Sequence, residues 1–172
     1  MNMHAITKKL SKEKISKKCP SLLKINERKE KEINVYIVED NDMLNELIKI
    51  FINSYREMNL LGSAFNGKEA VDEIKRMDIA PDVVLMDICM PKMNGIEATR
   101  EILTFNPLIK VIILTASVTK QNIADAFTAG AIGYLEKDGE LNIIIREAIN
   151  RAFREKENLI FLPYKLADYL LE

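Results

Sequence analysis

The sequence predicts an α/β fold in which a doubly wound sheet of five parallel strands carries helices on both faces. From Ile33 onward, short runs of β-branched residues alternate with longer segments whose apolar residues follow helical spacing. This alternation recurs five times, which is the pattern of repeated strand–helix units around a parallel sheet. The runs are almost entirely apolar, as expected for strands covered on both sides. The length of 172 residues suits one such domain with additional segments.

Five strands are expected, and each is a short apolar run followed by a polar residue. The second run is the weakest of the five. Because parallel strands need a crossover between them, the segments in between should be helices. The expected strands are Ile33–Val38, Leu60–Phe65, Val83–Met86, Val111–Leu114 and Ala131–Leu135.

Two of the intervening segments show a single buried helical face. After the first strand, the apolar positions are Leu44, Leu47, Ile48, Phe51, Ile52 and Tyr55. In the last helix they are Leu141, Ile144, Ile145, Ala148, Ile149 and Ala152, with Arg146, Glu147 and Arg151 on the opposite face. A third helix opens at Asn66 and Glu69, which resemble a capping box with asparagine in place of the hydroxyl residue.

The composition excludes several classes of protein. With 48% apolar and 30% charged residues the chain reads as a globular domain, and no apolar run is long enough to span a bilayer. The cysteines, Cys19 and Cys89, are too few for a disulfide framework, and the N-terminus lacks a signal-peptide pattern. We therefore expect a cytoplasmic protein. His4 is the single histidine and lies outside the domain, which excludes a histidine-based metal site or catalytic triad within it.

The charge is distributed unevenly along the chain. Residues 1–32 carry ten basic and four acidic groups, a net charge of +6, whereas the remainder has a net charge of −7. Scattered apolar residues and Pro20 indicate a flexible basic arm. A solvated tail is the preferred interpretation, and contact with a membrane surface or nucleic acid is the alternative.

Candidate functional residues follow the ends of the predicted strands. Glu39 and Asp40 follow the first strand, Asp87 the third, Thr115 the fourth, and Lys137 comes shortly after the fifth. Because the carboxyl ends of parallel strands lie on one edge of the sheet, these groups should converge there.

This set of groups indicates a metal-dependent phosphoryl site. Three crowded carboxylates need a cation, and an all-oxygen donor set selects Mg²⁺. Asp87 would be the nucleophile, because a carboxylate can form an aspartyl-phosphate, with Lys137 and Thr115 contacting the phosphoryl oxygens. Taken singly, each residue has a plainer role: Glu39 and Asp40 could cap the following helix. Their joint placement at strand ends favours the phosphoryl site over these separate roles.

Four blocks of sequence resemble the receiver domains of two-component response regulators, whose fold is flavodoxin-like. The resemblance extends from Asn34 to about Arg154. The blocks are Val38–Asp42, Leu85–Gly95, Ile113–Ala116 and Gly130–Asp138.

The resemblance implies a role for each site residue. Asp87 would accept phosphate from the phosphohistidine of a sensor histidine kinase or phosphotransfer protein. Mg²⁺ would be held by Glu39, Asp40, Asp87 and the backbone carbonyl of Cys89, and Lys137 would contact the phosphoryl group. Thr115 and Tyr134 would form the switch pair, the hydroxyl moving toward the phosphoryl group and the ring turning inward. A homodimer is a further expectation.

Asp138 after Lys137 resembles the subfamily that carries a C-terminal helix-turn-helix, and residues 159–171 resemble the linker and short helix that lead into it. We expect a basic arm over 1–32, a receiver domain over 33–156, and a linker with a short helix over 157–172. The sequence ends at Glu172, so we expect no sequence-specific DNA binding by the chain as given.

The preferred hypothesis is a phosphorylation-activated switch whose catalysis is limited to self-phosphorylation and self-dephosphorylation. A phosphorylation-independent interaction module and the receiver part of a truncated transcriptional regulator are alternatives. A phosphatase of the haloacid-dehalogenase type is less favoured, because Cys89 occupies the position of that family's second aspartate. DNA association through the basic arm is a further alternative.

Overall fold

A computed structural model describes residues 31–154 and residue 162. It has five parallel strands in the order β2-β1-β3-β4-β5, which confirms the predicted fold class. Two strands have the predicted bounds, and the other three are displaced by one or two residues at their ends. The strands are β1 (Ile33–Val38), β2 (Met58–Ala64), β3 (Val83–Met86), β4 (Lys110–Thr115) and β5 (Gly133–Glu136).

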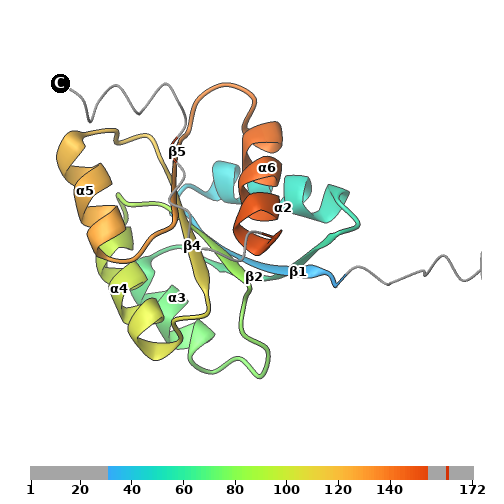
Figure 1. Cartoon of the computed structure of the whole chain (residues 1–172), viewed down its shortest axis with the longest axis horizontal. Coiled ribbons are helices and arrows are strands. Elements are labelled where there is room, and N and C mark those ends of the chain that lie inside the picture. Colours follow the sequence, from blue (N-terminus) through green and yellow to red (C-terminus); the bar gives the residue numbers. More distant parts are fainter. Residues whose placement is uncertain (1–30, 155–161, 163–172) are drawn as a thin grey trace, which may run out of the picture. The chain divides into compact units, whose positions relative to one another are not determined.

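Five helices cover the two faces of this sheet in the described part of the chain. Helices α2 and α6 lie on one face, and α3, α4 and α5 lie on the other (Figure 1). The helices are α2 (Asp42–Ser54), α3 (Gly67–Ile74), α4 (Gly95–Phe105), α5 (Lys120–Thr128) and α6 (Leu141–Arg154).

The alternation of side chains along the strands creates two separate cores. On β1, Val35 and Ile37 pack with α2 and α6, whereas Tyr36 and Val38 pack with α3, α4 and α5. All four side chains are buried. The sheet is therefore covered on both faces. The groups that are accessible at its edges and strand ends come from the loops.

The predicted helical faces are largely confirmed. On α6, the residues from Ile145 to Ala152 on the predicted stripe are buried, and Leu141 and Ile144 pack against the same core. On α2, Ile48 and Ile52 are buried, but Leu47 is 39% exposed, so its assignment to the buried face was wrong. Leu47 lies at the edge of the apolar stripe, on the side of the helix that faces solvent.

The helix N-termini explain which polar residues remain available at the strand ends. Asn41, and neither Glu39 nor Asp40, caps α2 by accepting a hydrogen bond from the Leu44 N–H at 2.9 Å. The N-cap of α2 is thus the residue that directly follows Asp40. The two carboxylates before it are therefore left for other interactions.

The caps of α3 and α4 differ from the prediction. Asn66 caps α3 by accepting from the Glu69 N–H, but the Glu69 carboxylate accepts from the backbone of Phe65, so only half of the predicted box forms. A complete capping box begins α4, between Asn94 and Glu97. It was not predicted, although it has the same sequence pattern.

The predicted basic arm and C-terminal helix lie outside the described residues, apart from Lys31, Glu32 and Leu162. Leu162 is partly buried against the core that α3, α4 and α5 share. None of the helices in the described part of the chain has the length and apolar composition needed to cross a lipid bilayer.

Candidate functional site

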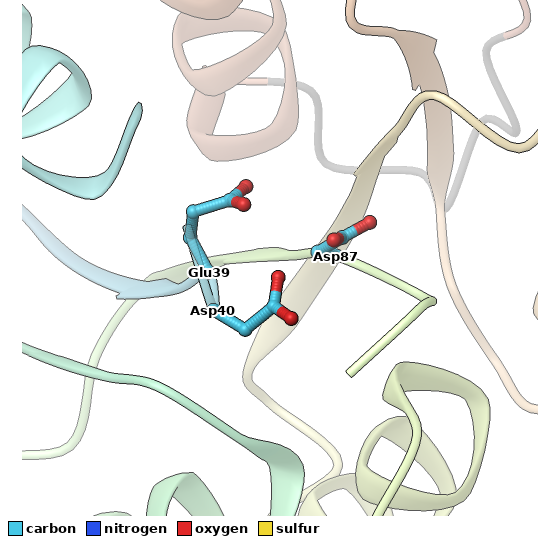
Figure 2. Close-up of side chains that lie close together, drawn as sticks. All are labelled: Glu39, Asp40 and Asp87. Atoms are coloured by element: carbon cyan, nitrogen blue, oxygen red, sulfur yellow. The ribbon is translucent and has the colours of Figure 1, made fainter. Parts of the chain in front are cut away.

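Three carboxylates meet where β1 and β3 end. One oxygen each from Glu39, Asp40 and Asp87 lies within 4.8 Å of the others (Figure 2). The register explains this proximity, because Val38 pairs with Met86 at the last position of both strands. The Asp87 N–H donates to the Val38 carbonyl oxygen at 2.9 Å, which fixes one carboxylate next to the other two.

Lys137 joins this group from the end of β5. Its Nζ atom lies 2.6 Å from Glu39 Oε2 and 2.9 Å from Asp87 Oδ2. Its backbone N–H donates to the Thr115 carbonyl oxygen at 3.0 Å, which places the side chain at the strand ends. One ammonium group therefore pairs with two buried carboxylates that come from distant parts of the sequence.

Burial and pairing shift the pKa values in this group. Burial raises the pKa of Glu39 above its ordinary value, and the nearby ammonium of Lys137 opposes this rise. Burial acts to lower the pKa of Lys137, but hydrogen bonds to Glu39 and Asp87 outweigh it, so this pKa is raised. The ammonium therefore stays charged at neutral pH, where it stabilises the two carboxylates.

The donor set fits a hard divalent cation. Lys137 supplies one positive charge against three carboxylates, so negative charge is in excess. Carboxylate oxygens are the ligands that Mg²⁺ prefers, and Mg²⁺ usually retains several waters. Asp40 is exposed, which gives an ion and its waters access. Cys89 lies two residues beyond Asp87, and its side chain is exposed.

The loop after β3 holds Asp87 through backbone contacts. The Gly95 N–H donates to the Ile88 carbonyl oxygen at 3.0 Å, and the Gly67 N–H donates to the Met93 carbonyl oxygen at 3.1 Å. A Cβ atom on Gly95 would lie 1.8 Å from the carbonyl oxygen of Asp87. Only glycine allows the start of α4 to approach Asp87 so closely.

The two predicted switch residues both contact the loop after β4, since Thr115 ends β4 and Tyr134 lies on β5. Thr115 and Tyr134 are both fully buried. The Thr115 hydroxyl oxygen accepts from the Ser117 N–H at 3.2 Å, and the Tyr134 hydroxyl donates to the Ser117 carbonyl oxygen at 2.6 Å. The Tyr134 ring therefore lies inward. Burial, more than any nearby charge, raises the pKa of its hydroxyl.

Sequence reasoning missed three polar residues near these groups. Asn45 is fully buried on α2 and donates to the Glu39 carbonyl oxygen at 3.0 Å. An asparagine within an apolar helical stripe was a signal that could have revealed it. Ser117 and Asn122 connect the loop after β4 to α5. Polar residues are ordinary in a loop and in the first turn of a helix, so the sequence offered no signal for these two.

The sequence is similar to those of known proteins. The family model described as the response regulator receiver domain matches residues 35–150. The chain is 37% identical over 114 residues to the transcriptional regulatory protein LnrK of Bacillus subtilis, covering 66% of this chain and 51% of that protein. It is 35% identical over 117 residues to the chemotaxis protein CheY of Thermotoga maritima, covering 68% of this chain and 94% of that protein.

A solved structure shows the same likeness. A chain of the CheX–CheY–BeF₃–Mg²⁺ complex from Borrelia burgdorferi superposes with a TM-score of 0.65 at 28% identity, covering 73% of this chain and 93% of that chain. The chain spans about half the length of several of the curated transcriptional regulators it matches.

Proposed function

The chain belongs to the response regulator receiver family, and from this membership we propose that it is a signalling switch that accepts a phosphoryl group on Asp87. The observation that carries the proposal is the position of the Asp87 carboxylate. It is buried, lies 2.9 Å from the Lys137 ammonium, and shares the strand ends with Glu39 and Asp40. The proposed donor is the phosphohistidine of a sensor histidine kinase or phosphotransfer protein.

The transfer needs one nucleophile and positive charge that compensates the negative charge of the phosphoryl group. A carboxylate oxygen of Asp87 attacks the phosphorus atom and forms a new P–O bond. The P–N bond to the donor histidine breaks, its electron pair stays on the imidazole nitrogen, and that nitrogen takes a proton from solvent. Lys137 is positioned to pair with a phosphoryl oxygen as negative charge arrives beside Asp87.

We further propose that Glu39, Asp40, Asp87 and the backbone carbonyl of Cys89 hold Mg²⁺. When bound, the ion offsets the charge of the phosphoryl oxygens. The excess of carboxylates over ammonium groups supports this assignment. The similar Borrelia burgdorferi structure contains Mg²⁺ together with BeF₃.

The proposed output is a change in protein contacts. Thr115 and Tyr134 would act as the switch pair, and the surface formed by α5, β5 and α6 would contact a partner or a second copy of the chain. We propose a cytoplasmic protein without turnover of external substrates. Residues 1–32 and 157–172 are proposed as a basic arm and a linker with a short helix. The alternative is a role as the receiver part of a transcriptional regulator, the class in which its name places the similar protein LnrK.

Intact mass measurement tests the proposal directly. The full chain is incubated with Mg²⁺ and acetyl phosphate, alongside Asp87→Asn and, as a matched control, Asp72→Asn on the exposed side of α3. We expect a Mg²⁺-dependent gain of one phosphoryl group in the native protein and in Asp72→Asn, and none in Asp87→Asn. A gain that persists in Asp87→Asn would overturn the assignment of the acceptor.

A phosphorylation-independent interaction module is the second candidate. The observation that favours it is the buried Tyr134 ring, whose hydroxyl is held by the Ser117 carbonyl oxygen through a contact that does not involve Asp87. The mass experiment separates the two candidates. A folded native protein that gains no phosphoryl group would favour the module.

A further inference from the structure

Two side chains from different elements converge on Ser117. The Tyr134 hydroxyl, from β5, donates to the Ser117 carbonyl oxygen at 2.6 Å. The Asn122 amide, from α5, donates to the same carbonyl oxygen at 3.2 Å and to the Ser117 hydroxyl oxygen at 2.9 Å. Ser117 therefore ties the loop after β4 to both neighbouring elements.

The start of α5 fixes the position of Asn122. The Asn122 N–H donates to the hydroxyl oxygen of Thr119, the N-cap of the helix, at 3.0 Å. With its backbone held in the first turn of α5, Asn122 can direct its side chain back along the loop toward Ser117. The contact is local in sequence and only partly buried, so it can break without unfolding the core.

The shared carbonyl makes the two contacts interdependent. Tyr134 is fully buried, so its hydroxyl needs an acceptor within the protein to lie inward without penalty. Ser117 supplies that acceptor only while the loop keeps its present position. Whatever holds Ser117 in place therefore also favours the inward position of the Tyr134 ring.

We propose that Asn122 is a positioning residue that sets the switch equilibrium by holding the Ser117 carbonyl where the Tyr134 hydroxyl reaches it. The Asn122 contact then favours the inward position of Tyr134, and its loss raises the outward population. The inference rests on the proposed function in one respect, namely that partner binding responds to the position of Tyr134. Loss of a single net hydrogen bond should shift such an equilibrium roughly fivefold.

The variant Asn122→Asp separates positioning from a structural role. Aspartate has nearly the same shape but lacks both amide donors, and its negative charge repels the Ser117 oxygens. A carboxylate in the first turn of α5 is favourable for the helix, so thermal stability should not fall. Asn150→Asp on α6 is the matched control, because it makes the same chemical change at an asparagine bonded to the Arg146 carbonyl oxygen.

The readout is ¹⁹F NMR of the full chain labelled with 3-fluorotyrosine, with the Tyr134 signal assigned from Tyr134→Phe. In the absence of phosphodonor, we expect the solvent-exposed population of Tyr134 to rise roughly fivefold in Asn122→Ala, which loses the hydrogen bond, and further in Asn122→Asp, which adds repulsion. Asn150→Asp should leave the signal unchanged.

Two results would overturn the inference. One is an unchanged Tyr134 signal in both Asn122 variants while the fold is intact. The other is a loss of thermal stability in these variants with no change at Tyr134, which would make Asn122 merely structural. Both readouts are taken without phosphorylation, so they do not depend on the mass experiment. If the protein gained no phosphoryl group there, the proposed function would be contradicted, but an effect of Asn122 on the position of Tyr134 would still stand.

Discussion

The loops that follow β3 and β4 leave neighbouring strands at the same edge of the sheet, yet they are held in different ways. The loop after β3 is fixed by backbone hydrogen bonds at Ile88, Met93 and Gly95, and by the close approach of Gly95 to Asp87. The loop after β4 is held through the side chains of Thr115, Asn122 and Tyr134 and the backbone and hydroxyl of Ser117.

This difference separates two tasks that a switch must perform. Backbone bonds reinforced by close packing leave a loop few alternative positions, which suits the segment that holds the proposed phosphoacceptor. Partly buried side-chain bonds can exchange with water at small net cost, which suits the segment that we propose adopts two positions. We infer that the loop after β3 is the fixed half of the site and the loop after β4 is its adjustable half.

The largest effect is expected from breaking the fixed half with Gly95→Ala. The added Cβ atom would lie 1.8 Å from the Asp87 carbonyl oxygen, and backbone cannot move aside as a flexible side chain can. We expect the free energy of unfolding to fall by at least about 3 kcal/mol. Urea denaturation measures the change.

Gly139→Ala is the matched control. Gly139 has a positive φ of 69°, but a Cβ atom added there would meet no atom of the described residues within 4 Å beyond its chain neighbours. Alanine at this position should therefore cost only the left-handed conformation, about 1 kcal/mol. Equal losses in the two variants would show that the approach of Gly95 to Asp87 is not what fixes this loop.

The next largest effect is expected for Lys137→Met, which leaves the buried carboxylates of Glu39 and Asp87 without their cation. The free energy of unfolding should fall by about 3 kcal/mol, the usual cost of leaving a buried charge unpaired. Added Mg²⁺ should recover part of this loss if the carboxylates hold the ion. Denaturation with and without Mg²⁺ measures both effects.

Lys75→Met provides the control for Lys137→Met. Lys75 pairs with Glu101 at 3.3 Å on the surface, and both side chains are well exposed. Such a pair contributes about 0.5 kcal/mol, and its loss should not respond to Mg²⁺. If Lys137→Met proved as mild as this control, the ammonium would not be compensating the two carboxylates.

The change in the free energy of unfolding with pH should be smaller than the losses expected for Gly95→Ala and Lys137→Met. The reason is that a buried carboxyl group can take up a proton instead of remaining charged. Burial raises the pKa of Glu39 above its ordinary value of 4.5. Between 4.5 and the raised value, the unfolded chain loses the proton first, so the free energy of unfolding falls as the pH rises through this range. Denaturation midpoints measured without Mg²⁺ should show this slope, and Glu39→Gln should reduce it. An unaltered slope in that variant would assign it to other groups.

The sequence predicted the fold and the polar strand ends, but not how the adjustable half is held. The apolar runs and the order of the strands determine that Glu39 and Asp87 meet, because parallel strands bring their carboxyl ends to one edge. The sequence predicted a contact of Lys137 with a phosphoryl group and not its direct ion pairs with Glu39 and Asp87, since these depend on side-chain reach. The Ser117–Asn122 contact depends on the path of one loop and leaves no periodic signal.

The smallest stability change, about 0.5 to 1 kcal/mol, is expected for Tyr134→Phe, which removes one hydrogen bond to a carbonyl oxygen that Asn122 still contacts. Its local effect should nevertheless distinguish the two loops. Hydrogen exchange at the Ser117 amide, in the adjustable half, should accelerate several-fold, whereas exchange at the Gly95 amide should not change.

Tyr36→Phe serves as the control for this last comparison, because the Tyr36 hydroxyl donates at 2.5 Å to Glu73 on α3, outside both loops. Removing that phenol should leave exchange at Ser117 and Gly95 unaltered. If Tyr134→Phe instead accelerated exchange at both amides, the two loops would open together. The site would then move as one unit, and the division into a fixed and an adjustable half would fail.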